Sequence, residues 1–216
     1  MHDPDEPDSS LPKKSGPPPH DAGRSAPLLG DSAHPAPAPQ DADVADVAPG
    51  RDPVLTRRSI RKYTDEPVSE AHVERLLRAA MAAPSAGDQR PWRFVVVRDR
   101  ATLTAITEVH PYARMLRQAP LAIVVCADTQ LKKWPQFWEQ DCAAATENIL
   151  IEAEILGLGA VWLGVHPLPE RVEGIRRLLA LPDHIVPFAV VAVGHPVERK
   201  PPAERFDPAR VHRECW

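Results

Sequence analysis

Residues 121–127, Leu-Ala-Ile-Val-Val-Cys-Ala, form an unbroken apolar run that decides the class of fold. Such a run, without polar alternation, is typical of a β-strand that is buried on both faces of a sheet. Three more apolar stretches predict further strands at Phe94–Val97, Ala160–Val165 and Phe188–Val193. The sequence therefore predicts a central sheet built from these strands.

Apolar residues that recur at spacings of three and four predict helices between the strands. Ser69 is placed to cap the first helix, and Pro84 ends it. The predicted helices open at Ser69–Glu70, run from Asp99 to His110, span 136–156 with Gly157 as the C-terminal cap, and run from Pro169 to about Leu179, with a further turn or two within Tyr112–Gln118. Helices that alternate with apolar strands indicate an α/β sandwich.

The composition of the chain changes near residue 50. Residues 1–50 contain eleven prolines, no aromatic residue, and nine acidic against three basic residues. Such a segment cannot bury enough apolar surface to offset the entropy lost on ordering. We expect a disordered Pro/Ala/Asp-rich tail that acts as a linker, with a partner-binding tail as the alternative. Residues 51–216 hold all eleven aromatic residues and are expected to form one domain.

Charge and hydropathy exclude several classes of partner. Residues 51–216 carry 23 basic and 21 acidic side chains, so a strongly basic surface for nucleic acid is not expected. No apolar run reaches the roughly 18 residues of a membrane-spanning helix. The N-terminus is acidic and interrupted by prolines, unlike a secretory signal. We expect a cytoplasmic protein that binds neither nucleic acid nor a membrane.

Several well-known site motifs do not occur in the sequence. It contains no GxGxxG, GxxxxGK[ST], GxSxG or HExxH, and its nine histidines are scattered, so we expect no nicotinamide-type Rossmann site, no P-loop and no metal. Cys126, Cys142 and Cys215 fit neither a disulfide scaffold nor a CxxC site. They are expected to be buried or incidental thiols.

The longest predicted helix and the C-terminus suggest burial between subunits. Residues 136–156 are rich in alanine and leucine, and the last twenty or so residues contain four prolines without periodicity, which predicts an extended arm. A few strands and helices in a domain of this size give a thin core. We therefore expect an obligate dimer.

Three segments carry groups that suit a small ligand. Arg57–Arg61 places three guanidiniums and a hydroxyl within five residues, a set that matches a phosphate. The loop Ala83–Trp92 offers backbone amides and polar side chains to a planar heterocycle. A glycine-flanked strand ends at Gly164, where the missing side chain would admit a ring close to the backbone. Taken singly, each also has a plain structural interpretation: a solvated basic run, a connecting turn and tight sheet packing.

In combination and in this order, the segments resemble the nitroreductase family of flavin-dependent oxidoreductases. The resemblance rests on Arg57–Tyr63, Ala83–Trp92, Gln140–Asn148 and Gly157–Gly164, and it runs from about Val54 to Trp216. It implies a mostly antiparallel or mixed sheet flanked by helices. It also implies a homodimer with FMN at the subunit interface, each of two sites being built from both chains.

The resemblance further implies roles for individual residues. Those that would hold the FMN phosphate and the pyrimidine edge of the flavin are Arg57, Arg58, Ser59 and Arg61. Arg205 would close on the phosphate, and Lys200 is a further candidate for this role. The second subunit would supply Pro84 and Ser85, with Asp88 and Gln89 nearby, and the backbone at Leu163 and Gly164 would face the flavin. Asp88 stands where the family usually has asparagine. An ionised aspartate accepts hydrogen bonds but cannot donate them, and its charge would disfavour an anionic reduced flavin.

The implied reaction is a ping-pong transfer of hydride from NAD(P)H through flavin N5 to a nitroaromatic, a quinone or a similar small acceptor. No catalytic side chain is needed, although the backbone of Gly164 and the side chain of Arg61 are candidates for tuning the flavin. Trp134, Phe137 and Trp138 would cover the flavin and stack on the acceptor, or would pack in the dimer interface. The alternatives are a reductive dehalogenase, a flavin-degrading enzyme, or a flavin-binding module without turnover.

Overall fold

The computed structural model describes residues 52–131 and 133–216, so the disordered tail expected at residues 1–50 lies outside the described residues. The strands are β1 (Trp92–Val97), β2 (Leu121–Asp128), β3 (Gly159–Gly164) and β4 (Ile185–Gly194). The helices are α1 (Pro53–Thr56), α2 (Glu70–Met81), α3 (Arg100–Val109), α4 (Trp138–Ile155) and α5 (Pro169–Leu178). Short 3₁₀ turns are η1 (Ala86–Asp88), η2 (Arg114–Arg117), η3 (Pro135–Phe137) and η4 (Pro208–Arg210). Within the described ranges, no helix combines the length and the apolar character needed to cross a membrane.

The four strands form one antiparallel sheet in the order β1-β2-β4-β3. The sheet confirms the four expected strands, and of the mostly antiparallel or mixed sheets that the resemblance implies, it is the antiparallel one. β2 pairs with strands on both sides, whereas β3 pairs with β4 alone and lies at an edge. The position of β3 at the edge decides where a ligand can reach the backbone.

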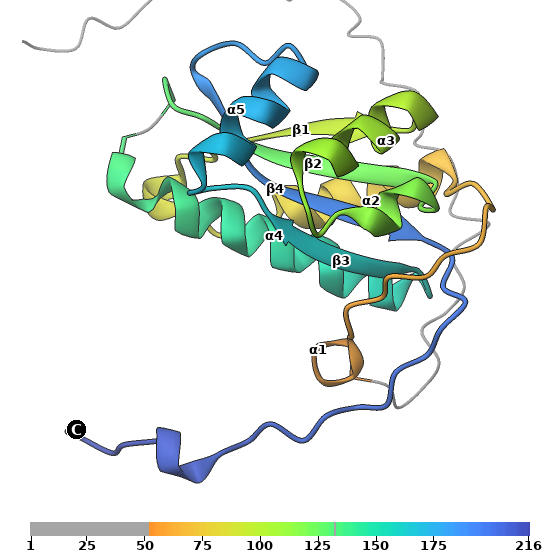
Figure 1. The fold of residues 1–216 in the computed structure, drawn as a ribbon. Helices are drawn as coiled ribbons and strands as arrows, with labels where there is room; N and C mark the ends of the chain where they lie inside the picture. The colour runs from red at the N-terminus through yellow and green to blue at the C-terminus, as the bar shows by residue number, and fades with distance from the viewer. Residues whose placement is uncertain (1–51, 132) are drawn as a thin grey trace, which may run out of the picture. The chain divides into compact units, whose positions relative to one another are not determined.

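Helices cover both faces of the sheet (Figure 1). On one face, α2 and α4 pack against Leu121, Ile123 and Val125 of β2. On the other face, α3, α5 and η2 pack against the alternate residues Ala122 and Val124. Successive side chains of a strand point to opposite faces, so a strand covered on both sides must be apolar throughout.

Local sequence signals set the helix ends. The Ser69 hydroxyl accepts a hydrogen bond from the His72 N–H at 3.1 Å at the start of α2. The Asp99 carboxylate accepts one from the Thr102 N–H at 2.7 Å at the start of α3. Gly157, just after α4, has a φ of +70°, a backbone conformation that glycine adopts without strain. These caps agree with the prediction from the sequence.

Several elements differ from the predicted bounds by one or two residues, and two of the differences have a clear physical reason. The predicted helix 136–156 begins only at Trp138, because Pro135–Phe137 form a 3₁₀ turn. Strand β4 extends back to Ile185, past a β-bulge at which Cys126 of β2 pairs with Pro187. Proline cannot donate to the ladder, and a bulge is one place where a sheet tolerates it.

The chain after β4 contains a single 3₁₀ turn, η4, among its described residues, and residues 201–216 are exposed. Its first part returns to the body of the domain. Tyr63 and Pro196 form an isolated bridge, and the Val197 N–H donates to the Lys62 C=O at 3.2 Å. This contact brings the segment after β4 beside Arg57–Arg61.

Candidate functional site

The outer edge of β3 is open along its second half. The Val165 N–H, directly after β3, donates to the Phe188 C=O at 3.1 Å. Bonded and non-bonded pairs alternate along an antiparallel ladder. The backbone groups of Ala160, Trp162 and Gly164 therefore point away from β4. These outward N–H and C=O groups are available to other partners.

The arginine-rich segment Arg57–Arg61 takes the first of these outward positions. The Ile60 N–H donates to the Ala160 C=O at 3.0 Å. The buried Tyr63 hydroxyl donates to the Ile60 C=O at 2.5 Å, and burial raises the pKa of Tyr63 far above its usual value, so the hydroxyl stays a donor. Both backbone groups of Ile60 are therefore hydrogen-bonded, the N–H to β3 and the C=O to Tyr63, and these bonds hold the segment beside β3.

The chain after β4 holds the same segment from outside. The Lys200 Nζ donates to the Ser59 C=O at 2.6 Å, and the Arg58 Nε donates to the Pro201 C=O at 3.0 Å. Arg57 is placed differently, because its Nε lies 3.2 Å from a carboxylate oxygen of Glu147 on α4. The predicted phosphate-binding residues Arg58, Ser59 and Lys200 therefore come together, whereas Arg57 faces a helix.

A small hollow of about 100 Å³ lies beside this segment. Its lining residues are Thr56, Arg58, Ile60, Glu154, Gly157, Leu158, Pro196, Glu198, Arg199 and Lys200. Arg58 Nη2 is buried and has no hydrogen-bond partner among the described residues. An unpaired buried N–H of a charged group is costly, so this nitrogen favours an anion.

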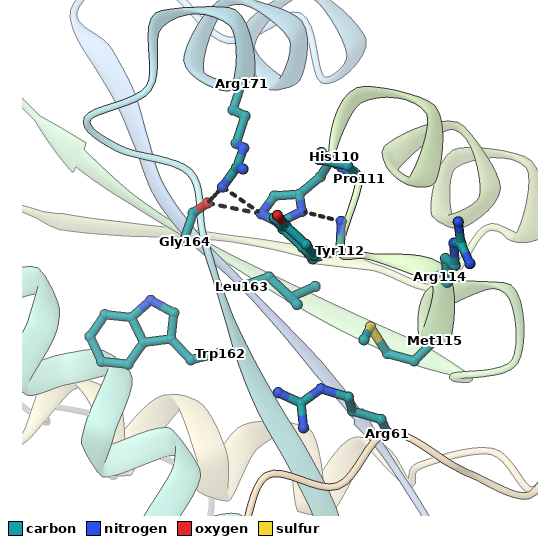
Figure 2. A pocket seen from close by; sticks show the side chains of 10 residues that line it. All are labelled: Arg61, His110, Pro111, Tyr112, Arg114, Met115, Trp162, Leu163, Gly164 and Arg171. Atoms are coloured by element: carbon teal, nitrogen blue, oxygen red, sulfur yellow. Dashed lines mark hydrogen bonds between the residues drawn. The ribbon is translucent and has the colours of Figure 1, made fainter.

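A larger cavity of about 640 Å³ borders the open half of the β3 edge (Figure 2). Its lining residues are Arg61, His110, Pro111, Tyr112, Arg114, Met115, Trp162, Leu163, Gly164 and Arg171. Its volume lies within the usual range for small-molecule sites. Three predicted site residues, Arg61, Leu163 and Gly164, thus line one cavity.

Gly164 borders open space. A Cβ atom built at this position would have no neighbour within 4 Å. Tight sheet packing, the alternative reason for a glycine here, does not apply. By contrast, a Cβ at Gly159 would lie 2.7 Å from an Ile60 methyl carbon, which is a true packing constraint.

His110 and Arg171 meet at the outward C=O of Gly164 (Figure 2). The His110 Nε2 lies 2.8 Å and the Arg171 Nη1 2.9 Å from this oxygen. The Tyr112 N–H donates to His110 Nδ1 at 3.2 Å, so the proton of the neutral ring is on Nε2 and is donated to Gly164. Burial, and to a lesser extent the charge of Arg171, lowers the pKa of His110 and keeps the ring neutral at neutral pH.

The loop between α2 and β1 lies outside this cavity. None of the predicted residues Pro84, Ser85, Asp88 and Gln89 lines it in the described chain. The buried Gln89 side chain is used internally, because its Nε2 donates to the Asp141 carboxylate at 2.5 Å. The role predicted for these residues from a second subunit stays a prediction.

Asp88, the departure from the family pattern, has a partner within its own loop. Both carboxylate oxygens accept hydrogen bonds from Arg90, each at 2.6 Å. Both residues have positive φ angles, 54° and 47°. The paired guanidinium offsets the charge that Asp88 introduces, although the pair is exposed.

The aromatic segment before α4 divides into two parts. Trp138 packs its ring edge-on against His166, with ring centres 4.7 Å apart, and also against Phe188. Trp134 and Phe137 stay 49% and 36% exposed. Trp138 is therefore a packing residue within the chain, and the exposed pair is left for the lid or interface role.

The remaining predicted residues lie apart from both cavities. Arg205 is exposed and lines neither cavity in the described chain. Cys126 and Cys142 are fully buried, and burial raises the pKa of the Cys126 thiol to about 12. Neither thiol can act as a nucleophile at neutral pH, in agreement with the sequence-based expectation.

Four residues that line the large cavity were not predicted from the sequence: His110, Tyr112, Arg114 and Arg171. These side chains come from the α3–β2 connection and from α5, and the strand order brings both elements to β3. One local signal was present, since a histidine, a tyrosine and an arginine lie within five residues that begin at the last residue of a predicted helix. Arg171 carries no such signal.

Comparison with known proteins identifies the family. The family model described as "Nitroreductase family" matches residues 54–110 and 107–195. A protein of Methanothermobacter thermautotrophicus named "Putative NADH dehydrogenase/NAD(P)H nitroreductase" is 55% identical over 163 residues, covering 76% of this chain and 85% of its own. A Thermus thermophilus protein named "NADH dehydrogenase" is 33% identical over 190 residues, covering 73% and 91% of the two chains.

Solved structures agree with the sequence comparisons. An "FMN-dependent Nitroreductase" from Clostridium difficile R20291 superposes with a TM-score of 0.71 at 30% identity, covering 76% of this chain and 98% of that one. The chain therefore belongs to the nitroreductase family.

Proposed function

We propose that this protein is an FMN-dependent oxidoreductase that takes hydride from NAD(P)H and delivers it to a small acceptor such as a nitroaromatic or a quinone. One observation carries the proposal. The segment Arg58–Arg61 lines both the small hollow, whose wall carries three basic and two acidic side chains, and the large cavity at the open β3 edge. A ligand with a phosphate at one end and a planar ring at the other matches this pair of cavities.

The residues present fit such a ligand. Arg58 offers a buried N–H without a partner among the described residues, and Lys200 lies beside it. Gly164 has no side chain at the cavity wall, so a planar ring can approach its backbone. Arg58, Ser59 and Lys200 would hold the FMN phosphate, and Arg61, Leu163 and Gly164 would face the flavin ring.

Bound FMN would supply the electron chemistry, accepting two electrons from the nicotinamide and passing them to the acceptor in a ping-pong cycle. The protein would position the flavin and supply the electrostatic environment around its ring. The Gly164 N–H, which points away from β4, provides a fixed donor at the cavity wall. Arg61 provides positive charge, and Leu163 and Met115 add apolar side chains to the wall.

We further propose that a second copy of the chain completes the site. Pro84, Ser85, Asp88 and Arg205 line neither cavity in their own chain, so the roles implied for them require a partner. Exposed apolar side chains, including Trp134, Phe206 and Trp216, give a second copy surface to cover. Analytical ultracentrifugation should find a dimer at micromolar concentration, and a stable monomer would contradict this part of the proposal.

The test is a visible spectrum of the purified protein before and after anaerobic addition of NADH or NADPH. Flavin bands near ~450 nm that bleach on addition would support the proposal. Bands that persist would favour a flavin-binding module without turnover. Absence of flavin after reconstitution with FMN would refute the cofactor assignment.

A matched pair of variants sharpens the test. Arg58→Gln removes the unpaired guanidinium nitrogen of a residue that lines the small hollow, and should weaken FMN binding by about tenfold or more, as expected for a lost charged hydrogen bond. Arg78→Gln is the control, because Arg78 is exposed on α2 and, among the described residues, its side chain pairs with Glu74 alone. Equal FMN affinity of the two variants would contradict the phosphate assignment.

A further inference from the structure

We propose that the large cavity selects an electron acceptor that carries a negative charge, a planar aromatic carboxylate or sulfonate, and that Arg171 recognises the charged group. The inference rests on the proposed function, since it names the substrate class of that site. It arises from the charge of the cavity wall and from the way in which Arg171 is held.

The cavity wall is cationic. Arg61, Arg114 and Arg171 line it, whereas no aspartate or glutamate does so among the described residues. His110 adds no charge at neutral pH, because burial lowers its pKa. A pocket lined by one sign of charge concentrates ligands of the opposite sign.

Neighbouring acidic side chains do not neutralise this wall. Glu173 on α5 pairs with Arg176. Glu139 contacts His166. Glu198 approaches Arg61, but it accepts a hydrogen bond from the backbone N–H, at 2.8 Å. The three cavity arginines form no salt bridge with any carboxylate in the described part of the chain.

Arg171 is held in place for recognition. Its Nη1 donates to the Gly164 C=O at 2.9 Å, and its guanidinium carbon lies 5.6 Å from the centre of the Tyr112 ring. The Arg171 Nη1 also lies 3.5 Å from His110 Nε2, but both nitrogens carry hydrogen. This contact is therefore not a hydrogen bond, and it occupies no further N–H group of the Arg171 guanidinium. One hydrogen bond and one aromatic ring thus hold the Arg171 guanidinium, which has five N–H donors. The remaining donors stay available for a carboxylate.

The position of Arg171 in the sequence supports a ligand role. It lies in the first turn of α5, where a cation opposes the helix dipole, so helix stability does not account for it. Tyr112 beside it is 71% exposed and offers a ring face to a planar acceptor. Arg61 lies at the opposite end of the cavity and belongs to the proposed flavin site (Figure 2).

The test compares 4-nitrobenzoate with 4-nitrobenzamide, which has nearly the same shape without the charge. For Arg171→Gln in the FMN-loaded protein, kcat/KM for nitrobenzoate should fall by about tenfold to a hundredfold, mainly through KM. The value for nitrobenzamide should stay within about twofold of the unmodified protein. Arg171→Lys should restore part of the loss, and Arg177→Gln, an exposed arginine of the same helix, should change neither substrate.

A binding measurement separates this inference from the proposed function. Benzoate and benzamide are titrated against the holoprotein, with tryptophan fluorescence as the readout, because Trp162 lines the cavity. Arg171→Gln should raise the Kd of benzoate alone, whether or not the protein turns over. Flavin that is absent or not reduced would contradict the proposed function, whereas benzoate binding would still test the anion site.

Other results would overturn the proposal. Equal losses for the charged and the neutral acceptor would give Arg171 a structural role only. Unchanged benzoate affinity in Arg171→Gln would exclude anion recognition by this side chain. A variant that loses discrimination between NADPH and NADH, but not between the two acceptors, would assign Arg171 to the donor's phosphate.

Discussion

Gln89→Ala should destabilise the protein more than any change at an exposed glutamine. The Gln89 amide joins the loop between α2 and β1 to the segment before α4. Its Nε2 donates to the Asp141 carboxylate at 2.5 Å and to the Trp134 C=O at 3.2 Å, and its Oε1 accepts from the Trp134 N–H at 3.0 Å. Gln89 is 8% and Asp141 4% exposed, so water does not readily replace these bonds.

The magnitude follows from the three bonds. A hydrogen bond to a buried carboxylate is worth about 2 kcal/mol, and each neutral bond about 1 kcal/mol. Asp141 keeps one other donor, the Ala86 N–H at 2.9 Å. We expect Gln89→Ala to lower the free energy of unfolding by about 3–4 kcal/mol, a large part of the total for a single domain.

Urea denaturation followed by circular dichroism measures this loss. Gln118→Ala serves as the control, because Gln118 is exposed and its side chain makes no hydrogen bond in the described structure, so the change should stay within about 0.5 kcal/mol. Hydrogen exchange should also accelerate at Trp134 and Ala86 in the Gln89 variant. A loss below about 1 kcal/mol, with unchanged exchange, would refute the view that this amide holds the two segments together.

Three further changes test other parts of the site. Gly87→Ala should cost about 1–3 kcal/mol in urea unfolding, because φ is +55° and a methyl group there would overlap the Trp134 indole; a neutral result would contradict the close packing. Tyr63→Phe should cost about 1–2 kcal/mol, since it leaves the buried C=O of Ile60 without its hydroxyl donor; an unchanged midpoint would show that this bond is dispensable. His110 has a pKa lowered below 6.5, chiefly by burial and in part by Arg171, so between that lowered value and 6.5 the unfolded chain binds more protons. The free energy of unfolding should therefore fall as the pH drops below 6.5, and urea midpoints across this range should fall less steeply in His110→Gln.

Local rules predicted most of the secondary structure. Ser69 and Asp99 begin their helices and Gly157 follows the end of α4, as expected, because each residue acts through its own backbone neighbourhood. The start of β4 was predicted too late. Its bulge depends on which residue of β2 faces Pro187, and pairing partners distant in sequence are not encoded in a local pattern.

The candidate site was predicted only in part. The arginine cluster and the glycine-flanked strand pointed to Arg61 and Gly164, the family resemblance implied their roles, and the structure brings both residues to one cavity. It could not supply Arg171, because only the strand order β1-β2-β4-β3 places α5 beside the end of β3. The same limit applies to Gln89, whose hydrogen-bond partners lie 45 and 52 residues further along the chain.

The need to protect an edge strand explains why the site forms where it does. An exposed strand edge presents unpaired N–H and C=O groups that invite pairing with another chain. Here Ile60 closes the edge at Ala160, and His110 with Arg171 closes the C=O of Gly164. The groups between these two closures face the large cavity, where a planar ligand can reach the backbone but a further strand would meet the side chains that line it. The residues that protect the sheet are thus the residues that shape the cavity, so a change at His110 or Arg171 should alter ligand binding before it alters the fold.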